Sequence, residues 1–153
     1  MSSPRNARPV PPSPRQVDVR GPRFAAWVTS AVLAVALLTA SGWLVAVQAA
    51  VFAVGAFAGL RYAPYGVLFR VLVAPRLGPV REREPEAPPR FAQLVGLVFA
   101  VVGATGYLIG APLVGAVATG LALVAALLNA ATGFCLGCEL HLIVRRAQTA
   151  RTV

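Results

Sequence analysis

The sequence has 153 residues, of which 58% are hydrophobic and only 12% are charged. A soluble globular domain carries about a quarter of charged residues, so this composition argues against an ordinary soluble fold and for a membrane protein. All 14 basic residues are arginine, against 5 acidic residues, and the net charge is +9. Nucleic-acid binding needs such charge on a solvated face or arm, whereas these arginines lie between apolar runs. We expect the lipid bilayer as a partner, and no nucleic acid.

The first apolar run extends from Phe24 to Leu60 without a charged residue. Residues 1–22 before it are rich in Pro, Ser and Arg, a composition that predicts a disordered tail. About twenty helical residues cross the hydrocarbon core, so the run is nearly twice too long for one pass. Ser41-Gly42 is the turn-like interruption near its middle. The run therefore predicts two spans, at about residues 24–40 and 43–60.

A second uncharged block runs from Phe91 to Phe134, and Gly110-Ala111-Pro112 interrupts it. Because proline fits only the first turn of a helix, this block predicts spans at about residues 91–109 and 113–133. Between the blocks, the cytoplasmic loop 61–90 contains an apolar stretch, Tyr65–Ala74, that is too short to span. It predicts a short interfacial helix, followed by a solvated linker.

The predicted fold is therefore an all-α integral membrane protein with four transmembrane helices arranged as two hairpins. The transmembrane domain covers residues 23–146, and residues 147–153 form a tail. Five arginines precede the first span, six lie in the central loop and three follow the last span, whereas the two tight turns contain none. The positive-inside rule places all three arginine-bearing segments in the cytoplasm. We expect a multi-pass protein of the bacterial inner membrane with both termini cytoplasmic.

Small residues recur at four-residue spacing within the apolar blocks, and helix packing is their expected role. The positions are Gly55 and Gly59, and Gly106 and Gly110. Asn129 is one of the few polar side chains in a span, and we expect it to form an interhelical hydrogen bond. Pro-Arg-Phe-Ala occurs at 22–25 and again at 89–92. This repeat indicates either two related halves or simply the usual residues at a helix start.

Cys135 and Cys138 are the only cysteines and stand in C-x-x-C spacing near the predicted inner face. Thiol redox or sulfur-transfer chemistry needs such a pair, and the cytoplasm disfavours a permanent disulfide. If Gly133 ends the fourth helix, Cys135 opens a new helix, whose N-terminus favours the thiolate. If the helix continues through Gly133, the dipole opposes the thiolate. The sequence leaves both arrangements open.

Other functions find less support around this pair. Cys135, Cys138 and His141 are three possible ligands, whereas a structural zinc takes four, so we expect no metal and no cofactor. Glu139 stands where a haem-attachment motif has histidine. His141 is the only histidine and has no serine nearby, so no hydrolase constellation is present. The alternative to redox chemistry is that both cysteines are packing residues, with Glu139 and His141 on the solvated side.

Three segments resemble the bacterial membrane family catalogued as domain of unknown function 4395. They are Arg-Gly-Pro-Arg-Phe before the first span, Pro-Arg-Phe-Ala-Gln at 89–93 and Gly-Phe-Cys-Leu-Gly-Cys-Glu at 133–139. The likeness covers about residues 17–146. Members are often encoded near thioredoxin-like and thiosulfate sulfurtransferase-like proteins, so the resemblance implies thiol or sulfur handling through Cys135 and Cys138. The family often has an aromatic residue where His141 stands, which argues against a general role for this histidine.

We therefore expect cytoplasmic-face thiol redox or sulfur exchange with a thioredoxin-like or thiosulfate sulfurtransferase-like partner. Whether this makes the protein an enzyme, and which cysteine attacks, stays open at this point. Glu139 and His141 are candidate modulating residues. The alternative function is a non-enzymatic membrane scaffold or a small-solute permeation subunit, in which glycine faces assemble a homo-oligomer.

Overall fold

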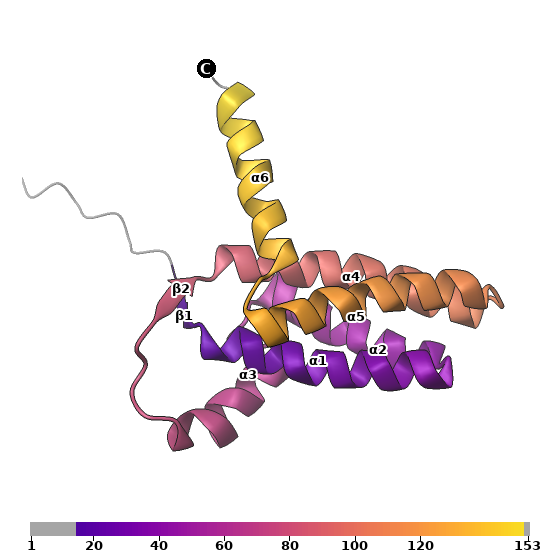
Figure 1. Cartoon of the computed structure of the whole chain (residues 1–153), viewed down its shortest axis with the longest axis horizontal. Coiled ribbons are helices and arrows are strands. Elements are labelled where there is room, and N and C mark those ends of the chain that lie inside the picture. Colours follow the sequence, from indigo (N-terminus) through magenta and orange to yellow (C-terminus); the bar gives the residue numbers. More distant parts are fainter. Residues whose placement is uncertain (1–14, 152–153) are drawn as a thin grey trace, which may run out of the picture.

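The computed structural model describes residues 15–151. Four long helices form a bundle: α1 (Arg20–Thr39) packs on α2 (Gly42–Ala53) and on α5 (Pro112–Thr132). The remaining helix, α4 (Ala87–Leu108), packs on both α2 and α5 and closes the ring. The four helices run side by side along the long axis of the molecule (Figure 1).

Two tight turns lie together at one end of the bundle (Figure 1). The α1–α2 turn passes through Ala40 and the α4–α5 turn through Gly110, both with left-handed backbone, at φ 49° and 79°. The Ser41 side chain then caps α2 by accepting the N–H of Leu44 at 3.3 Å. Because each turn joins adjacent antiparallel helices, each half of the bundle is a helical hairpin.

The second helix is the shortest of the bundle. α2 continues into the π-helical turn η1 (Val54–Ala58), and Gly59 ends it with a φ of 107°. The whole apolar helix, Gly42–Ala58, is shorter than α1, α4 and α5, which are the three helices within residues 15–151 that are long and apolar enough to cross a membrane. These three helices fit a membrane protein, and the four-span arrangement stays a prediction.

The core between the helices is built mainly from small side chains. Ala36, Ala49, Ala100 and Ala104 are buried together with Val45. Beside the α4–α5 turn, Gly106 faces Gly115, and an added Cβ at Gly106 would lie 2.6 Å from the Gly115 backbone nitrogen. Small residues let helix backbones approach closely, which is the usual packing mode of helices in lipid.

The connection between the hairpins contains short helical pieces and one strand. The helical pieces are α3 (Pro64–Leu68), the π-helical turn η2 (Phe69–Val73) and the 3-10 turn η3 (Ala74–Arg76). They cover the stretch predicted to be a short helix. The strand β2 (Arg83–Pro85) pairs antiparallel with β1 (Gln16–Asp18), which the sequence did not predict.

Glu86 follows β2 and is only 5% exposed, although the sequence placed it in a solvated linker. Its carboxylate accepts the N–H of Leu60 at 2.9 Å and lies 4.0 Å from the guanidinium of Arg15. A buried carboxylate needs such partners. Glu86 thus fixes the chain just after the second helix to the start of α4.

The sixth helix, α6 (Leu136–Arg151), leaves the bundle and crosses α4 steeply (Figure 1). Gly137 forms the crossing point, since an added Cβ there would lie 2.5 Å from the Cα of Ala92. The ring of His141 packs on Phe91 one turn further along, with ring centroids 5.4 Å apart. Both cysteines therefore lie where α6 begins and touches the bundle.

Helix ends differ from the predicted spans where charge and proline flank the apolar runs. α1 begins at Arg20, whose N–H donates to the carboxylate of Asp18 at 3.0 Å, and α4 begins at Ala87 with proline in its first turn. Apolar runs mark contact with lipid, whereas helical hydrogen bonding extends beyond them. Of the predicted tail 1–22, residues 1–14 lie outside the described residues, and residues 147–151 of the C-terminal tail continue α6.

The repeated Pro-Arg-Phe-Ala element makes equivalent contacts in the two hairpins. Arg23 donates to the carbonyls of Ala130 and Ala131 at the end of α5, at 3.3 and 3.5 Å. Arg90 donates to the carbonyls of Ala56 and Phe57 at the end of η1, at 2.9 and 3.2 Å. Each arginine thus caps the last turn of a helix in the other hairpin, which favours two related halves.

Candidate thiol site

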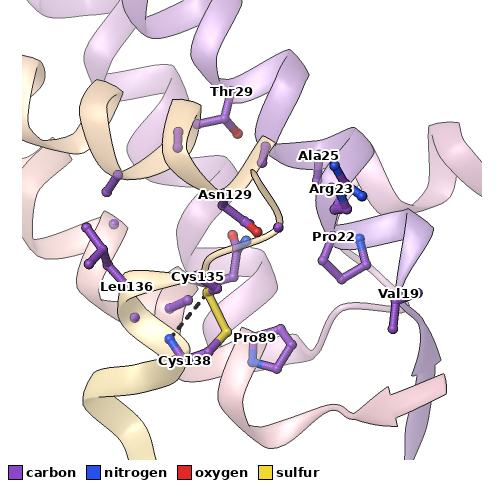
Figure 2. Close-up of a pocket in the computed structure, with 18 of the residues that line it drawn as sticks. Val19, Pro22, Arg23, Ala25, Thr29, Pro89, Asn129, Cys135, Leu136 and Cys138 are labelled. Carbon is purple, nitrogen blue, oxygen red and sulfur yellow. Dashed lines mark hydrogen bonds between the residues drawn. A yellow bond between two sulfur atoms is a disulfide. The ribbon is translucent and has the colours of Figure 1, made fainter. Parts of the chain in front are cut away.

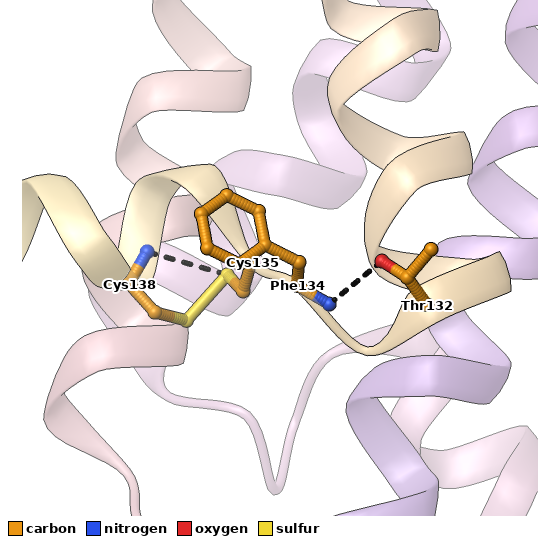
Figure 3. Close-up of a disulfide and its surroundings, with 4 residues drawn as sticks. All are labelled: Thr132, Phe134, Cys135 and Cys138. Atoms are coloured by element: carbon orange, nitrogen blue, oxygen red, sulfur yellow. Dashed lines mark hydrogen bonds between the residues drawn. A yellow bond between two sulfur atoms is a disulfide. The ribbon is translucent and has the colours of Figure 1, made fainter.

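The site begins where α5 ends. Gly133 has left-handed backbone with a φ of 76°, a conformation that suits glycine, and its N–H closes the helix on the carbonyl of Asn129 at 2.9 Å. The next N–H, that of Phe134, donates to the hydroxyl of Thr132 at 3.2 Å (Figure 3). These contacts end α5 and turn the chain sharply, so the fourth predicted span, which is α5, breaks at Gly133.

Cys135 directly precedes α6 and occupies the capping position of this helix. Its carbonyl accepts the N–H of Glu139 at 3.0 Å, and its Sγ accepts the N–H of Cys138 at 3.3 Å. A capping side chain normally satisfies one of the free N–H groups of the first turn in this way. Of the two arrangements left open by the sequence, the structure has the one in which Cys135 opens a new helix.

Cys135 and Cys138 form a disulfide, with Cα atoms 5.1 Å apart (Figures 2 and 3). One turn of helix therefore brings both sulfurs together without any other element. The first-turn N–H groups of α6 point toward Cys135, and they favour negative charge on its sulfur when the disulfide is reduced.

Glu139 and His141 are part of α6 but neither side chain bonds to a cysteine in the described part of the chain. Glu139 is exposed in the first turn of α6. His141 contacts Phe91 of α4 through its ring. Residues 15–151 contain no group of three His, Cys, Asp or Glu side chains that could hold a metal ion.

A cavity of about 330 Å³ lies between the disulfide and the interior of the bundle (Figure 2). It extends along α5 from Asn129, beside the cysteines, to Ala122, which is two helical turns or about 10 Å deeper. Much of its wall consists of small residues, including Ala26, Gly96 and Ala126. The two cysteines thus line the end of the cavity that lies away from the interior of the bundle.

Two amide side chains line this cavity, Gln93 from α4 and Asn129 from α5. Figure 2 shows Asn129 on α5 at the end of the cavity where Cys135 and Cys138 lie. Within residues 15–151 neither amide group has a hydrogen-bond partner, whereas Oε1 of Gln48, elsewhere in the bundle, accepts the hydroxyl of Tyr65 at 2.7 Å and Nε2 of Gln48 has no partner. The interhelical hydrogen bond predicted for Asn129 is therefore not formed, and its polar atoms face the cavity.

Three charged residues line the cavity, Arg23 from α1 and Glu82 and Glu84 from the segment around β2. The guanidinium of Arg23 is already bonded to the carbonyls that end α5. Burial raises the pKa of Glu84, and the neighbouring charge of Glu82 raises it further. The rim of the cavity is therefore more acidic than basic.

The glycines assigned to packing occupy two kinds of position. An added Cβ at Gly55 would lie 2.8 Å from Oε1 of Gln93, and Gly106 lies against Gly115. Gly59 and Gly110 have positive φ and end helices, and Gly110 has open space around it. Of these four glycines, Gly55 is therefore the one that packs against an amide lining the cavity.

Sequence reasoning gave Gln93 no role at this site and did not give Arg23 its capping role. The signal for both was present in the repeated Pro-Arg-Phe-Ala element, which places Arg23 at the foot of α1 and Gln93 directly after Phe91-Ala92. Such a repeat can reveal equivalent positions, but only the packed bundle shows which carbonyls and which cavity they meet.

Comparison with known proteins gives one positive finding. No curated protein and no solved structure matches this chain. A family model described as domain of unknown function (DUF4395) matches residues 17–146, which include the whole bundle, both Pro-Arg-Phe-Ala elements and the cysteine pair. The chain belongs to the DUF4395 family.

Proposed function

We propose that the protein carries out thiol redox or sulfur exchange at the cytoplasmic face of the inner membrane. The observation that supports this most is the placement of the chain's only two cysteines, paired at the start of α6 and open to a cavity. A pair used only for packing needs neither the capping contact to Cys135 nor a hollow beside it.

The proposed topology has four spans, with the N- and C-terminal segments cytoplasmic. In its favour, both tight turns lie at one end of the bundle (Figure 1). The elements that carry the arginines of residues 15–151 are the start of α1 and the segment before it, the connection between the hairpins, the start of α4 and α6, and these lie toward the other end or beyond it. The 17 residues of Gly42–Ala58 reach about 25 Å, slightly less than a hydrocarbon core of about 30 Å. A modest mismatch of this kind is accommodated by local thinning of the bilayer.

In this topology α6 lies at the membrane surface, across the end of the bundle. Its apolar side chains, such as Leu140 and Ile143, are exposed in the isolated chain, while Arg145 and Arg146 follow them. An amphipathic helix of this composition is typical of the lipid–water boundary. The disulfide then lies at that boundary, within reach of a soluble protein.

The proposed exchange uses Cys135 as the attacking residue and Cys138 as the resolving residue. Reduced Cys135, as thiolate, attacks a disulfide of the partner and forms a mixed disulfide while one partner sulfur leaves as a thiolate. Cys138 then attacks the Sγ of Cys135, closes the Cys135–Cys138 disulfide and releases the partner as a dithiol. The N–H of Cys138, which bonds to Cys135 Sγ, favours Cys135 as the attacking residue because it stabilises a thiolate there.

The same residues suit a sulfur-transfer version of the reaction. A thiosulfate sulfurtransferase-like partner carrying a persulfide would transfer its outer sulfur atom to the Cys135 thiolate and leave as a thiolate. Cys138 would then attack Cys135 Sγ, form the disulfide and release the outer sulfur as sulfide. Both versions cycle Cys135 and Cys138 between dithiol and disulfide, and a thioredoxin-like protein is the natural reductant or oxidant.

The test traps the partner through each cysteine in turn. The Cys138→Ser variant keeps the attacking sulfur but cannot resolve, so we expect a stable mixed disulfide on non-reducing gels. Cys135→Ser is the matched control and should trap at least ten-fold less. Equal trapping by both variants would contradict the assigned roles, and full function in the double variant would refute thiol exchange altogether.

Topology is tested separately with a membrane-impermeant maleimide. We expect labelling of the cysteines only in inside-out vesicles, and more labelling after reduction. Labelling from the outside of intact cells would reverse the proposed orientation.

The second candidate function is a non-enzymatic scaffold or a small-solute permeation subunit. The close approach of Gly106 to Gly115 and the small residues around the cavity favour it. It predicts strong effects of substitutions at Gly55, Gly59 or Asn129 on assembly or permeation and little effect of Cys135→Ser.

A further inference from the structure

The cavity behind the disulfide has no task in an exchange with a soluble protein, which would reach the sulfurs from the aqueous side. Interiors are normally packed without voids larger than a water molecule. Here the small side chains of Ala26, Gly96 and Ala122 leave a space of about 330 Å³ that extends into the bundle. This volume lies at the lower end of the range for small-molecule sites, so it suits a single substituted ring rather than a dinucleotide.

The polar groups in the wall define what such a ring must offer. Gln93 and Asn129 belong to different helices, line the same cavity and have no hydrogen-bond partner within residues 15–151. Both residues are half-buried, so their amide groups are accessible from the cavity. Two amide NH₂ groups can both be satisfied by one ligand that carries two carbonyl oxygens.

The charges around the cavity argue against an anion. Of the three charged side chains that line it, Glu82 and Glu84 are acidic, and the guanidinium of Arg23 is bonded to helix carbonyls. Sulfite or thiosulfate would meet two carboxylates against one guanidinium, part of which is bonded to helix carbonyls. A neutral molecule that is soluble in the bilayer meets no such barrier.

We propose that this cavity binds the headgroup of a membrane quinone, which accepts the electrons of the Cys135–Cys138 dithiol. The inference rests on the proposed thiol exchange and adds its electron acceptor. Cys135 and Cys138 lie at one end of the cavity, so the ring that the two amides hold is next to the sulfurs.

The reaction balances as a two-electron oxidation. Two S–H bonds break and one S–S bond forms, which oxidises the dithiol to the disulfide. The electron pair passes to the quinone ring, and the two protons end on its two oxygens, giving one quinol per disulfide. The partner's dithiol then reduces the disulfide by the exchange described above, run in reverse: one partner thiolate attacks Cys135 Sγ and releases Cys138, and the second partner thiolate closes the partner's disulfide and releases Cys135. Electrons therefore flow from a soluble thiol into the membrane.

The test uses the full-length protein, reduced and freed of reductant, in liposomes without oxygen. Decylubiquinone is one oxidant and hydroxyethyl disulfide, which needs no quinone site, is the other. We expect decylubiquinone to oxidise the pair with a stoichiometry of one quinol formed per two thiols lost. Oxidation by hydroxyethyl disulfide alone would overturn the quinone site and leave thiol exchange standing. Oxidation by neither would contradict both proposals.

Variants of the cavity locate the reaction. Asn129→Leu and Gln93→Leu remove the amides, and Ala126→Leu fills the cavity. For each we expect the rate with decylubiquinone, divided by the rate with hydroxyethyl disulfide on the same variant, to fall at least ten-fold. Ala50→Leu is the matched control, because Ala50 is exposed on α2 and does not line the cavity. An unchanged ratio in the three cavity variants would overturn the proposal.

Occupancy can be measured without turnover. In Cys138→Ser the remaining Cys135 cannot form the internal disulfide, and a bound ring should shield it. We expect decylubiquinone to slow alkylation of Cys135 at least five-fold, and Ala126→Leu to abolish this protection. Alkylation at the same rate with and without decylubiquinone would contradict binding at this cavity.

Discussion

Replacement of Gly137 by alanine tests whether close contact between α6 and α4 holds the thiol site together. The added Cβ would lie 2.5 Å from the Cα and 2.6 Å from the Cβ of Ala92, whereas ordinary contacts are 3.4 Å or more. The nearest atoms include backbone, so a side-chain rotation cannot relieve the overlap. α6 must therefore move about 1 Å or more away from α4, and overpacking of this kind costs about 1 to 3 kcal/mol.

Gly120→Ala is the matched control, because nothing lies within 4 Å of an added Cβ there. Both positions are helical, and alanine is intrinsically better than glycine in a helix by about 0.8 to 1 kcal/mol. We expect Gly120→Ala to stabilise the protein slightly and Gly137→Ala to weaken the docking of α6.

The assay is the rate at which a bulky maleimide alkylates the reduced cysteines in detergent. Every 1.4 kcal/mol of weakened docking raises the population of the undocked helix about ten-fold. The alkylation rate of Gly137→Ala should therefore rise about five- to one-hundred-fold over wild type, and that of Gly120→Ala should not rise. If both variants react at the same rate, the close contact does not hold α6.

Four other substitutions test contacts in and around the bundle. Arg23→Met and Arg90→Met each remove charged hydrogen bonds to helix-end carbonyls, so each should lower the free energy of unfolding by about 1 to 3 kcal/mol in a denaturant titration. Tyr65→Phe leaves the buried amide of Gln48 without its partner, and thermal unfolding should show a loss of about 1 to 3 kcal/mol. The folded-state pKa of Glu84 is raised, so its ionisation opposes folding as pH rises through that value. Glu84→Gln should therefore raise the melting temperature at pH 8 and lose this advantage at pH 4, and an equal shift at both pH values would contradict the reasoning.

The bundle helices follow from the sequence because long uncharged runs, broken at Ser41-Gly42 and at Gly110-Ala111-Pro112, can form little else in lipid. The helix ends were less predictable. Hydrogen bonding at Asp18 extends α1 beyond the apolar run, and Gly59 ends the second helix before it reaches the length of the others. The pair of short strands has too few residues for a periodic pattern, and it forms only because the packed bundle brings residues 16–18 beside residues 83–85.

The thiol site was only partly predictable. C-x-x-C spacing identified both cysteines, but the sequence allowed the fourth helix either to break at Gly133 or to continue through it. The left-handed backbone of Gly133 and the start of α6 at Leu136 place Cys135 at the N-terminal end of a helix dipole and not at the C-terminal end. Gln93 and Asn129 are far apart in the chain, and their common cavity exists only after α4 and α5 have packed.

The arginine caps make the two hairpins depend on each other. Arg23 belongs to the first hairpin and closes a helix end in the second, while Arg90 belongs to the second and closes a helix end in the first. Neither hairpin is complete as a separate unit, because each leaves carbonyls at one helix end without donors until the other arrives. Each hairpin thus supplies the arginine that caps a helix end in the other hairpin. A protein cut between residues 77 and 82 should reassemble from its two pieces in the membrane, held together in part by the hydrogen bonds of Arg23 and Arg90 to helix-end carbonyls.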